Sequence, residues 1–182
     1  MKSKDFIYNV EEKTPSIVHT ELARLEEKGI LKAVITQNID LLHQKAGSKR
    51  VVEVHGSPLV HRCLSCGKTR GFEEIAEIVQ RDVVPSCDAC GGPVKPDITF
   101  FFLSLPAAAV EEAIELSERA DVMLVLGSSL TVQPAASFPV YALRNGGKLV
   151  IVNNMDTPLD DRAELTYSDL LKVFSYIHDN LN

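Results

Sequence analysis

The stretch VMLVLGSSLTVQPAASFPVYALR, residues 122–144, carries the pattern that decides the fold class. The apolar run from Val122 to Leu126 has the length of a buried strand, small polar residues follow it, and a helix is predicted from Pro134 to Arg144. Apolar strands that alternate with helices are typical of a parallel sheet covered on both faces, so the sequence predicts an α/β protein. The further strands of this kind are predicted at residues 30–35, 98–102 and 149–152.

Helical patterns separate or follow these strands. The first helix is predicted from Thr14, a capping residue followed by proline, and is expected to end at Gly29. Two others are predicted at residues 39–46 and 107–119. The last is predicted from Ser168, with an apolar face formed by Leu170, Phe174, Ile177 and Leu181.

The composition is that of an ordinary globular protein of 182 residues, with 45% hydrophobic and 24% charged residues. A net charge of −6 without a basic stripe argues against a nucleic-acid-binding surface, which needs clustered lysine and arginine. The longest apolar stretch, residues 98–110, is shorter than the roughly 20 residues that span a bilayer. The opening residues MKSKDFIYNVEEK lack the apolar core of a signal peptide. We therefore expect a soluble, cytoplasmic protein that binds neither nucleic acid nor membrane.

The four cysteines form two Cys-x-x-Cys pairs within a glycine- and proline-rich segment, residues 59–96. Zinc prefers four soft or borderline ligands at tetrahedral corners, and paired turns of this spacing supply them. Four cysteine ligands leave no open coordination position, so the predicted role of the metal is structural. The alternative is a set of buried or redox-active thiols. The predicted zinc ligands are Cys63, Cys66, Cys87 and Cys90.

Polar residues follow the predicted strands at the places where open parallel sheets bind ligands, beyond the carboxyl ends of the strands. Small hydroxyl and amide groups suit ribose hydroxyls and phosphates, although the same residue types are common in turns and helix caps. Together the clusters indicate a nucleotide-binding crevice. They are Thr36-Gln37-Asn38-Ile39-Asp40, Gly127-Ser128-Ser129 and Asn153-Asn154.

The tetrapeptide Glu53-Val54-His55-Gly56 lies between a short apolar run and the cysteine segment. An imidazole titrates near neutral pH, so a histidine beside glycine at this junction is a candidate general base. The competing interpretation is a hydrogen-bonded structural histidine, and spacing alone does not decide between the two.

Several blocks of this sequence resemble the signature motifs of the sirtuin family in the same order. The likeness runs from about Thr14 to the C-terminus. It implies a Rossmann-like fold with a small zinc-ribbon module, NAD and zinc as cofactors, and acetylated or otherwise acylated lysine peptides or proteins as partners. The blocks are TQNIDLLHQKAG (36–47), EVHG (53–56), the two cysteine pairs, KPDITFF (95–101), GSSLTVQPAA (127–136) and KLVIVN (148–153).

The resemblance implies roles for the matching positions. His55 corresponds to the catalytic general base, with Asn38 as a second catalytic residue, and Val132 and Phe101 fall where the family binds the substrate peptide. In sirtuins the acetyl oxygen attacks C1′ of the nicotinamide ribose, nicotinamide leaves, and the histidine helps a ribose hydroxyl attack the resulting intermediate. The implied NAD contacts are Gln37, Asn38 and Asp40 on the nicotinamide side, and Gly127, Ser128, Ser129 and Asn153 on the adenosine side.

Two departures from the family pattern qualify this assignment. Sirtuins begin with a glycine-rich strand–loop–helix that cradles the NAD phosphates, and nothing of that kind precedes Thr14. The first βα unit of the sheet is therefore expected to be missing from this chain, which would leave two strand edges unpaired. Most family members also have Gly-Glu where this chain has Phe102 and Leu103, in the loop that lines the acyl-lysine tunnel. These two bulky residues are expected to narrow the tunnel or alter peptide choice.

The leading hypothesis is NAD-dependent removal of acyl groups from protein lysines, with release of nicotinamide and O-acyl-ADP-ribose. One alternative is a catalytically incomplete fragment that acts as a zinc-stapled binding module, and another is a mono-ADP-ribosyltransferase that uses the same site. The expected organisation places a remnant of a helical small-domain segment at residues 1–13, a Rossmann-like NAD-binding domain at 14–58 and 97–182, and the zinc-binding small domain at 59–96.

Overall fold

The computed structural model describes residues 7–8, 13–99 and 105–181. Its strands form three separate sheets. Two are parallel: β1 (Val34–Thr36) pairs with β2 (Val51–Glu53), and β7 (Lys148–Val152) lies between β6 (Val122–Leu126) and β8 (Leu165–Tyr167). The third is antiparallel, with β3 (Gly56–Cys63) between β4 (Thr69–Gly71) and β5 (Val94–Ile98). The prediction of an α/β fold with parallel sheets is confirmed.

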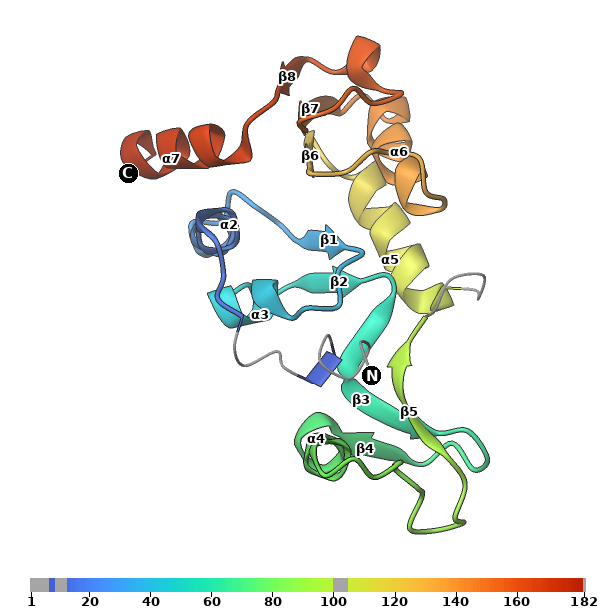
Figure 1. Cartoon of the computed structure of the whole chain (residues 1–182). Helices are drawn as coiled ribbons and strands as arrows, with labels where there is room; N and C mark the ends of the chain where they lie inside the picture. Colours follow the sequence, from blue (N-terminus) through green and yellow to red (C-terminus); the bar gives the residue numbers. More distant parts are fainter. Residues whose placement is uncertain (1–6, 9–12, 100–104, 182) are drawn as a thin grey trace.

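Helices connect and cover these sheets (Figure 1). The α5 helix runs between the cysteine-containing region and β6, and α6 packs against both β6 and β7. The C-terminal helix α7 packs against α2. The bounds are α2 (Ile17–Glu27), α3 (Leu42–Ala46), α4 (Phe72–Gln80), α5 (Ala107–Glu118), α6 (Phe138–Arg144) and α7 (Leu170–Asn180), with short 3₁₀ turns at Ala135–Ser137 and Asp160–Arg162.

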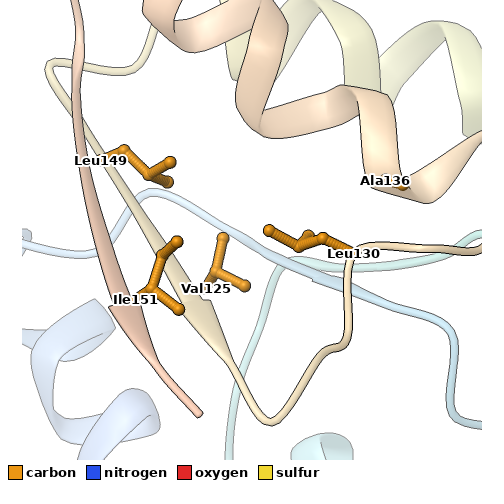
Figure 2. Packing of buried hydrophobic residues seen from close by; sticks show 5 residues of the cluster. All are labelled: Val125, Leu130, Ala136, Leu149 and Ile151. Carbon is orange, nitrogen blue, oxygen red and sulfur yellow. The ribbon is translucent and has the colours of Figure 1, made fainter. Parts of the chain in front are cut away.

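The apolar faces of the two parallel sheets are buried in separate clusters. Behind β6 and β7 the side chains of Val125, Leu130, Leu149 and Ile151 turn toward one interior, beside the 3₁₀ turn that carries Ala136 (Figure 2). The second cluster joins β2 and the residue after it to α5 and α6. It consists of Val52, Val54, Ala113 and Phe138. Helix α5 packs against β2, α6 packs against β6 and β7, and the two helices pack against each other, so together they connect the two parts of the fold.

The two parallel sheets are not joined by strand pairing in the described part of the chain: β1 pairs with β2 alone, and β6 pairs with β7 alone. Each of these strands therefore has one edge without a described strand partner. The expectation of two unpaired strand edges agrees with this arrangement.

Several predicted boundaries were wrong by a few residues. The first helix is capped at Ser16, not Thr14. Its neighbouring strand begins at Val34 instead of Ile30, because the amides of Ile30 and Leu31 bond back to the carbonyl of Leu25 and close the end of α2. Strand β5 ends at Ile98, and residues 100–102 of the strand predicted at 98–102 lie outside the described residues. Helix α3 starts at Leu42, and the helix predicted from Pro134 begins as a 3₁₀ turn.

Three other predicted elements lie within one residue of their predicted bounds, whereas α7 begins at Leu170 and not at the predicted Ser168. Strand β6 has the predicted bounds, β7 begins one residue before the predicted strand, and α5 ends one residue before its predicted end. The structure describes no helix that combines the length and the apolar character needed to cross a membrane.

Candidate functional site

The four cysteines converge at one end of the antiparallel sheet. Their sulfur atoms all lie within 4.8 Å of one another, with Cys63 Sγ 3.5 Å from Cys90 Sγ and Cys66 Sγ 3.7 Å from Cys87 Sγ. Backbone amides of Cys66 and Ser65 point at the Cys63 sulfur, and together with the neighbouring thiols they lower its pKa to about 6. A closed set of four sulfurs suits zinc, so these residues could hold a structural metal ion.

The turns that carry the cysteines are built alike. The amide of Gly67 donates to the carbonyl of Cys63 at 3.0 Å, and the amide of Gly91 donates to the carbonyl of Cys87 at 2.8 Å. Each pair is therefore a closed turn that places its two sulfurs on one side. Cys63 and Cys87 are buried beside Ile75 and Val94, while Cys66 and Cys90 are exposed.

His55 lies just beyond the carboxyl end of β2. Its Nδ1 is 2.8 Å from the backbone oxygen of Gln37. A carbonyl oxygen only accepts, so Nδ1 carries the hydrogen and Nε2 keeps a free lone pair in the neutral ring. The amide of Val54 also donates to the Thr36 carbonyl at 3.0 Å, which extends the pairing of the two strands up to the histidine.

The backbone around His55 is fixed from the other side by β5. The amide of Thr99 donates to the His55 carbonyl at 2.7 Å. A Cβ on Gly56 would lie 2.2 Å from the carbonyl oxygen of Asp97, and the φ of Gly56 is +78°. Only glycine accepts both the close approach and this backbone angle without strain, so the residue after the histidine is fixed by packing.

The loop between β1 and α3 brings Gln37, Asn38 and Asp40 to the same edge of the sheet. The amide of Asn38 donates to Thr36 Oγ1 at 3.1 Å, and the amide of Leu42 donates to Asp40 Oδ1 at 3.1 Å in an Asx turn that leads into α3. The Asn38 side chain is exposed, while those of Gln37 and Asp40 are partly buried. These groups are available to a ligand at the carboxyl edge that also holds His55.

Glu53 is a polar group of this edge to which the sequence analysis gave no role. Val52 and Val54 are buried in the core, so Glu53 and His55 share the opposite face of the strand. Burial raises the pKa of the Glu53 carboxyl, against hydrogen bonds from Ser57 and Gln44 that lower it. The alternation of valine with Glu53 and His55 was the signal that could have placed this carboxyl beside the histidine.

The second group of predicted residues lies at the carboxyl ends of β6 and β7. The amide of Gly127 donates to the Val152 carbonyl at 2.9 Å, and the amide of Asn153 donates to the Tyr167 carbonyl at 2.9 Å, so the two loops are adjacent. The Asn153 side chain donates to the Met155 carbonyl at 2.7 Å.

The hydroxyls of this second group face their own loop. Ser128 Oγ accepts from the amide of Leu130 at 3.3 Å, and Ser129 Oγ lies 2.8 Å from Thr131 Oγ1. Val132 is exposed at 53%. Phe101, Phe102 and Leu103 lie outside the described residues.

The structure thus gathers the predicted residues into two groups, each at the carboxyl edge of a different parallel sheet. One contains His55 with Gln37, Asn38 and Asp40, and the other contains Gly127, Ser128, Ser129 and Asn153. Parallel α/β folds commonly bind nucleotides at polar loops beyond the carboxyl ends of their strands, and this fold combines such loops with four cysteines that could hold a metal ion.

Comparisons with known proteins define the family. The sequence model described as "Sir2 family" matches residues 3–134. The NAD-dependent protein deacetylase of Thermotoga maritima is 49% identical over 166 residues, covering 91% of this chain and 68% of that protein. The NAD-dependent protein deacetylase of Thermodesulfovibrio yellowstonii is 40% identical over 167 residues, covering 91% of this chain and 65% of that protein. This chain therefore belongs to the Sir2, or sirtuin, family.

A solved structure agrees with that assignment. The structure described as "Sir2 bound to acetylated peptide" superimposes with a TM-score of 0.91 at 45% identity, covering 98% of this chain and 75% of that one. The chain spans about two thirds of the length of the two curated relatives, at 68% and 65%.

Proposed function

We propose that this chain carries the catalytic site of an NAD-dependent protein-lysine deacylase, which releases nicotinamide and O-acyl-ADP-ribose. The observation that carries the proposal is the hydrogen bond between His55 Nδ1 and the Gln37 carbonyl. It leaves Nε2 unprotonated in the neutral ring, at the carboxyl edge of two parallel strands, where ligands bind in this class of fold. The relatives named as NAD-dependent protein deacetylases support the same activity.

The donor set of the two carboxyl edges fits NAD. Amide and carboxylate groups of Gln37, Asn38 and Asp40 would hold the nicotinamide end, and the Gly127–Ser129 loop with Asn153 would hold the adenosine end. When bound, NAD supplies the ribose carbon that accepts the acyl oxygen and the hydroxyl whose proton must be removed. His55 Nε2 would take that proton, a step that contributes roughly 10²- to 10⁴-fold to a rate. Asn38 would orient the reacting groups.

The remaining assignments complete this proposal. Acylated lysine peptides or proteins would be the second substrate, bound through Val132 and Phe101. Residues 59–96 would form the zinc-binding small domain, and residues 14–58 and 97–182 the NAD-binding domain. We place the protein in the cytoplasm, because cysteines that hold zinc must stay reduced, which a reducing compartment maintains. Detection of the tagged protein in a soluble cytoplasmic fraction would test that location.

Nicotinamide release tests the function directly. The 182-residue chain is incubated with NAD, with and without an acetyl-lysine peptide, beside His55→Ala. Release should require the peptide, and His55→Ala should lower it by about 10²-fold or more. Circular dichroism and zinc content should stay as in the wild type, because the ring is not part of the core. Peptide-dependent release that is unchanged in His55→Ala would refute the assignment of the base.

The acceptor of ADP-ribose separates the deacylase from the mono-ADP-ribosyltransferase. A deacylase yields the free O-acyl ester, which mass spectrometry detects together with the deacetylated peptide. A transferase leaves ADP-ribose attached to protein. Accumulation of modified protein without the ester would overturn the proposal in favour of that alternative.

A further inference from the structure

An ionic cluster around one buried carboxylate lies outside the proposed catalytic site, where α2 meets α7. Glu21 is 3% exposed, although it is charged and sits in the middle of α2. Its carboxylate accepts from Arg24 Nε at 2.7 Å and lies 2.7 Å from His178 Nδ1 on α7. A buried carboxylate is costly unless it is paired and hydrogen-bonded, so this pairing links the two helices specifically.

Arg24 also binds the last turn of α7. Its Nη1 donates to the Leu181 carbonyl at 2.5 Å, and its Nη2 donates to the Ile177 carbonyl at 3.1 Å. The last carbonyls of a helix have no partner within the helix and carry partial negative charge. The planar guanidinium of Arg24 therefore binds Glu21 on α2 and the end of α7 at the same time. We call Glu21, Arg24 and His178 the α2–α7 clasp.

The same helix is fixed to the sheet that carries His55. The Glu26 carboxylate accepts from the amide of Lys49 at 2.8 Å and from the amide of Arg50 at 2.7 Å, at the entrance to β2. The carbonyl of Arg50 in turn accepts from the amide of Val34 in β1. Helix α2 is thus bound through Glu26 to the sheet that presents Gln37 and His55.

The other end of α7 reaches the second group of predicted residues. Asp169 caps the helix by accepting from the amide of Lys172 at 3.1 Å, directly after β8. The Leu170 side chain lies 3.6 Å from the place of a Cβ on Gly127. A chain of contacts therefore runs from the β1–β2 sheet through α2 and the clasp to α7 and the Gly127 loop (Figure 1).

We propose that Arg24 is a positioning residue, which sets the distance between the two edges that would hold the opposite ends of NAD. The inference rests on the proposed NAD binding. Among the described residues, helix contacts connect the two parallel sheets, and the contact between α2 and α7 is one of them. A ligand that binds both edges at once gains affinity only when their spacing matches its length. Loosening the clasp lowers the affinity for the whole dinucleotide and leaves the binding of each half unchanged.

The experiment compares NAD with AMP, which occupies one edge alone. Calorimetry on Arg24→Met should show NAD affinity reduced by about tenfold or more and AMP affinity within about twofold of wild type. Arg24→Lys keeps the charge but lacks the planar guanidinium, so its NAD affinity should lie between those of Arg24→Met and the wild type. The control is Lys148→Met, which removes an exposed 3.4 Å ion pair with Glu164 at the amino ends of β7 and β8, away from both carboxyl edges, and should change neither affinity.

Hydrogen exchange gives a readout that does not depend on NAD. In Arg24→Met the amides of α7 should lose protection, while those of β6 and β7 keep it. Equal losses of NAD and AMP affinity would show that Arg24 only stabilises one edge, and would overturn the proposal. Unchanged exchange in α7 would overturn it as well. A wild type that binds AMP but not NAD would refute the proposed function instead, and the exchange data would still decide whether the clasp holds the helices.

Discussion

The cysteine module and the parallel α/β region reach an ordered structure by different means. In the module, two of the four buried residues that form the core are metal-ligand candidates, Cys63 and Cys87. In the α/β region, the core consists of aliphatic and aromatic side chains brought together from distant strands and helices. The stability of the module is therefore expected to depend on one bound ion, whereas the stability of the α/β region depends on many small packing contributions.

The sharpest test of this difference is removal of one sulfur. Cys63→Ser should abolish stoichiometric zinc binding and unfold the module, because a structural zinc ion contributes on the order of 10 kcal/mol. Zinc content by atomic absorption and hydrogen exchange in β3 and α4 measure the effect. Amides in β6 and β7 should keep their protection. Ser65→Ala, an exposed neighbour that is not a ligand candidate, is the control. A full complement of zinc in Cys63→Ser would contradict the assignment.

Truncation in the α/β core should produce the opposite pattern. Ile151 is 1% exposed within the cluster of Figure 2. Ile151→Ala should lower the free energy of unfolding by about 2–5 kcal/mol through lost burial and a cavity. Urea unfolding measures this loss, and zinc content should not change. Leu171→Ala, at a side chain 63% exposed, should stay within about 0.5 kcal/mol. If Ile151→Ala also lost zinc, the two regions would not be energetically separate.

The smallest expected effect concerns a pair of histidines where α2 meets α3, His19 on α2 and His43 on α3. The ring centroids of His19 and His43 lie 4.7 Å apart, and His19 Nδ1 accepts a hydrogen bond from the amide of Ser16 at 3.2 Å. Burial lowers the pKa of both imidazoles, and the charge of Asp40 opposes the shift at each. The charge of His19 lowers the pKa of His43 further.

Both rings are therefore protonated more readily in the unfolded chain. Their contribution to stability is complete above the ordinary histidine pKa of 6.5 and is lost as the pH falls below it. Urea unfolding at several pH values should show this decline. In His19→Gln it should be smaller, because glutamine at this position accepts the same amide without titrating. An identical pH dependence in both proteins would exclude the pair as its source.

The parts of the fold that could be predicted are those decided by short-range pattern. The run from Val122 to Leu126 is apolar throughout and gave β6 with its observed bounds. The cysteine spacing predicted the convergence of the four sulfurs. In both cases, residues close in sequence carry the whole signal.

The errors arose where backbone hydrogen bonds override hydrophobic pattern. Ile30 and Leu31 are apolar and were assigned to a strand, but their amides close the end of α2. The helix itself begins at Ile17 with Ser16 as its N-cap, because His19 accepts the Ser16 amide in the place usually taken by glutamate or glutamine.

The site was harder to predict than the fold, because its geometry depends on long-range contacts. His55 was a candidate base from its neighbours, but its hydrogen bond to the Gln37 carbonyl follows from the pairing of β1 with β2. Glu53 and the α2–α7 clasp gave no sequence signal of their own. Glu21 and His178 are 157 positions apart, and a charged residue in a helix is usually taken as exposed.

The partner of His55 has a consequence for how this site tolerates mutation. Many enzymes hold a basic imidazole with an aspartate or glutamate side chain, which a single base change can remove. Here the acceptor is a main-chain oxygen, which every amino acid at position 37 would supply. The backbone conformation of this loop therefore fixes the orientation of the imidazole. Side chains of the loop can be substituted during evolution, and the ligand they bind can change, while His55 keeps its orientation.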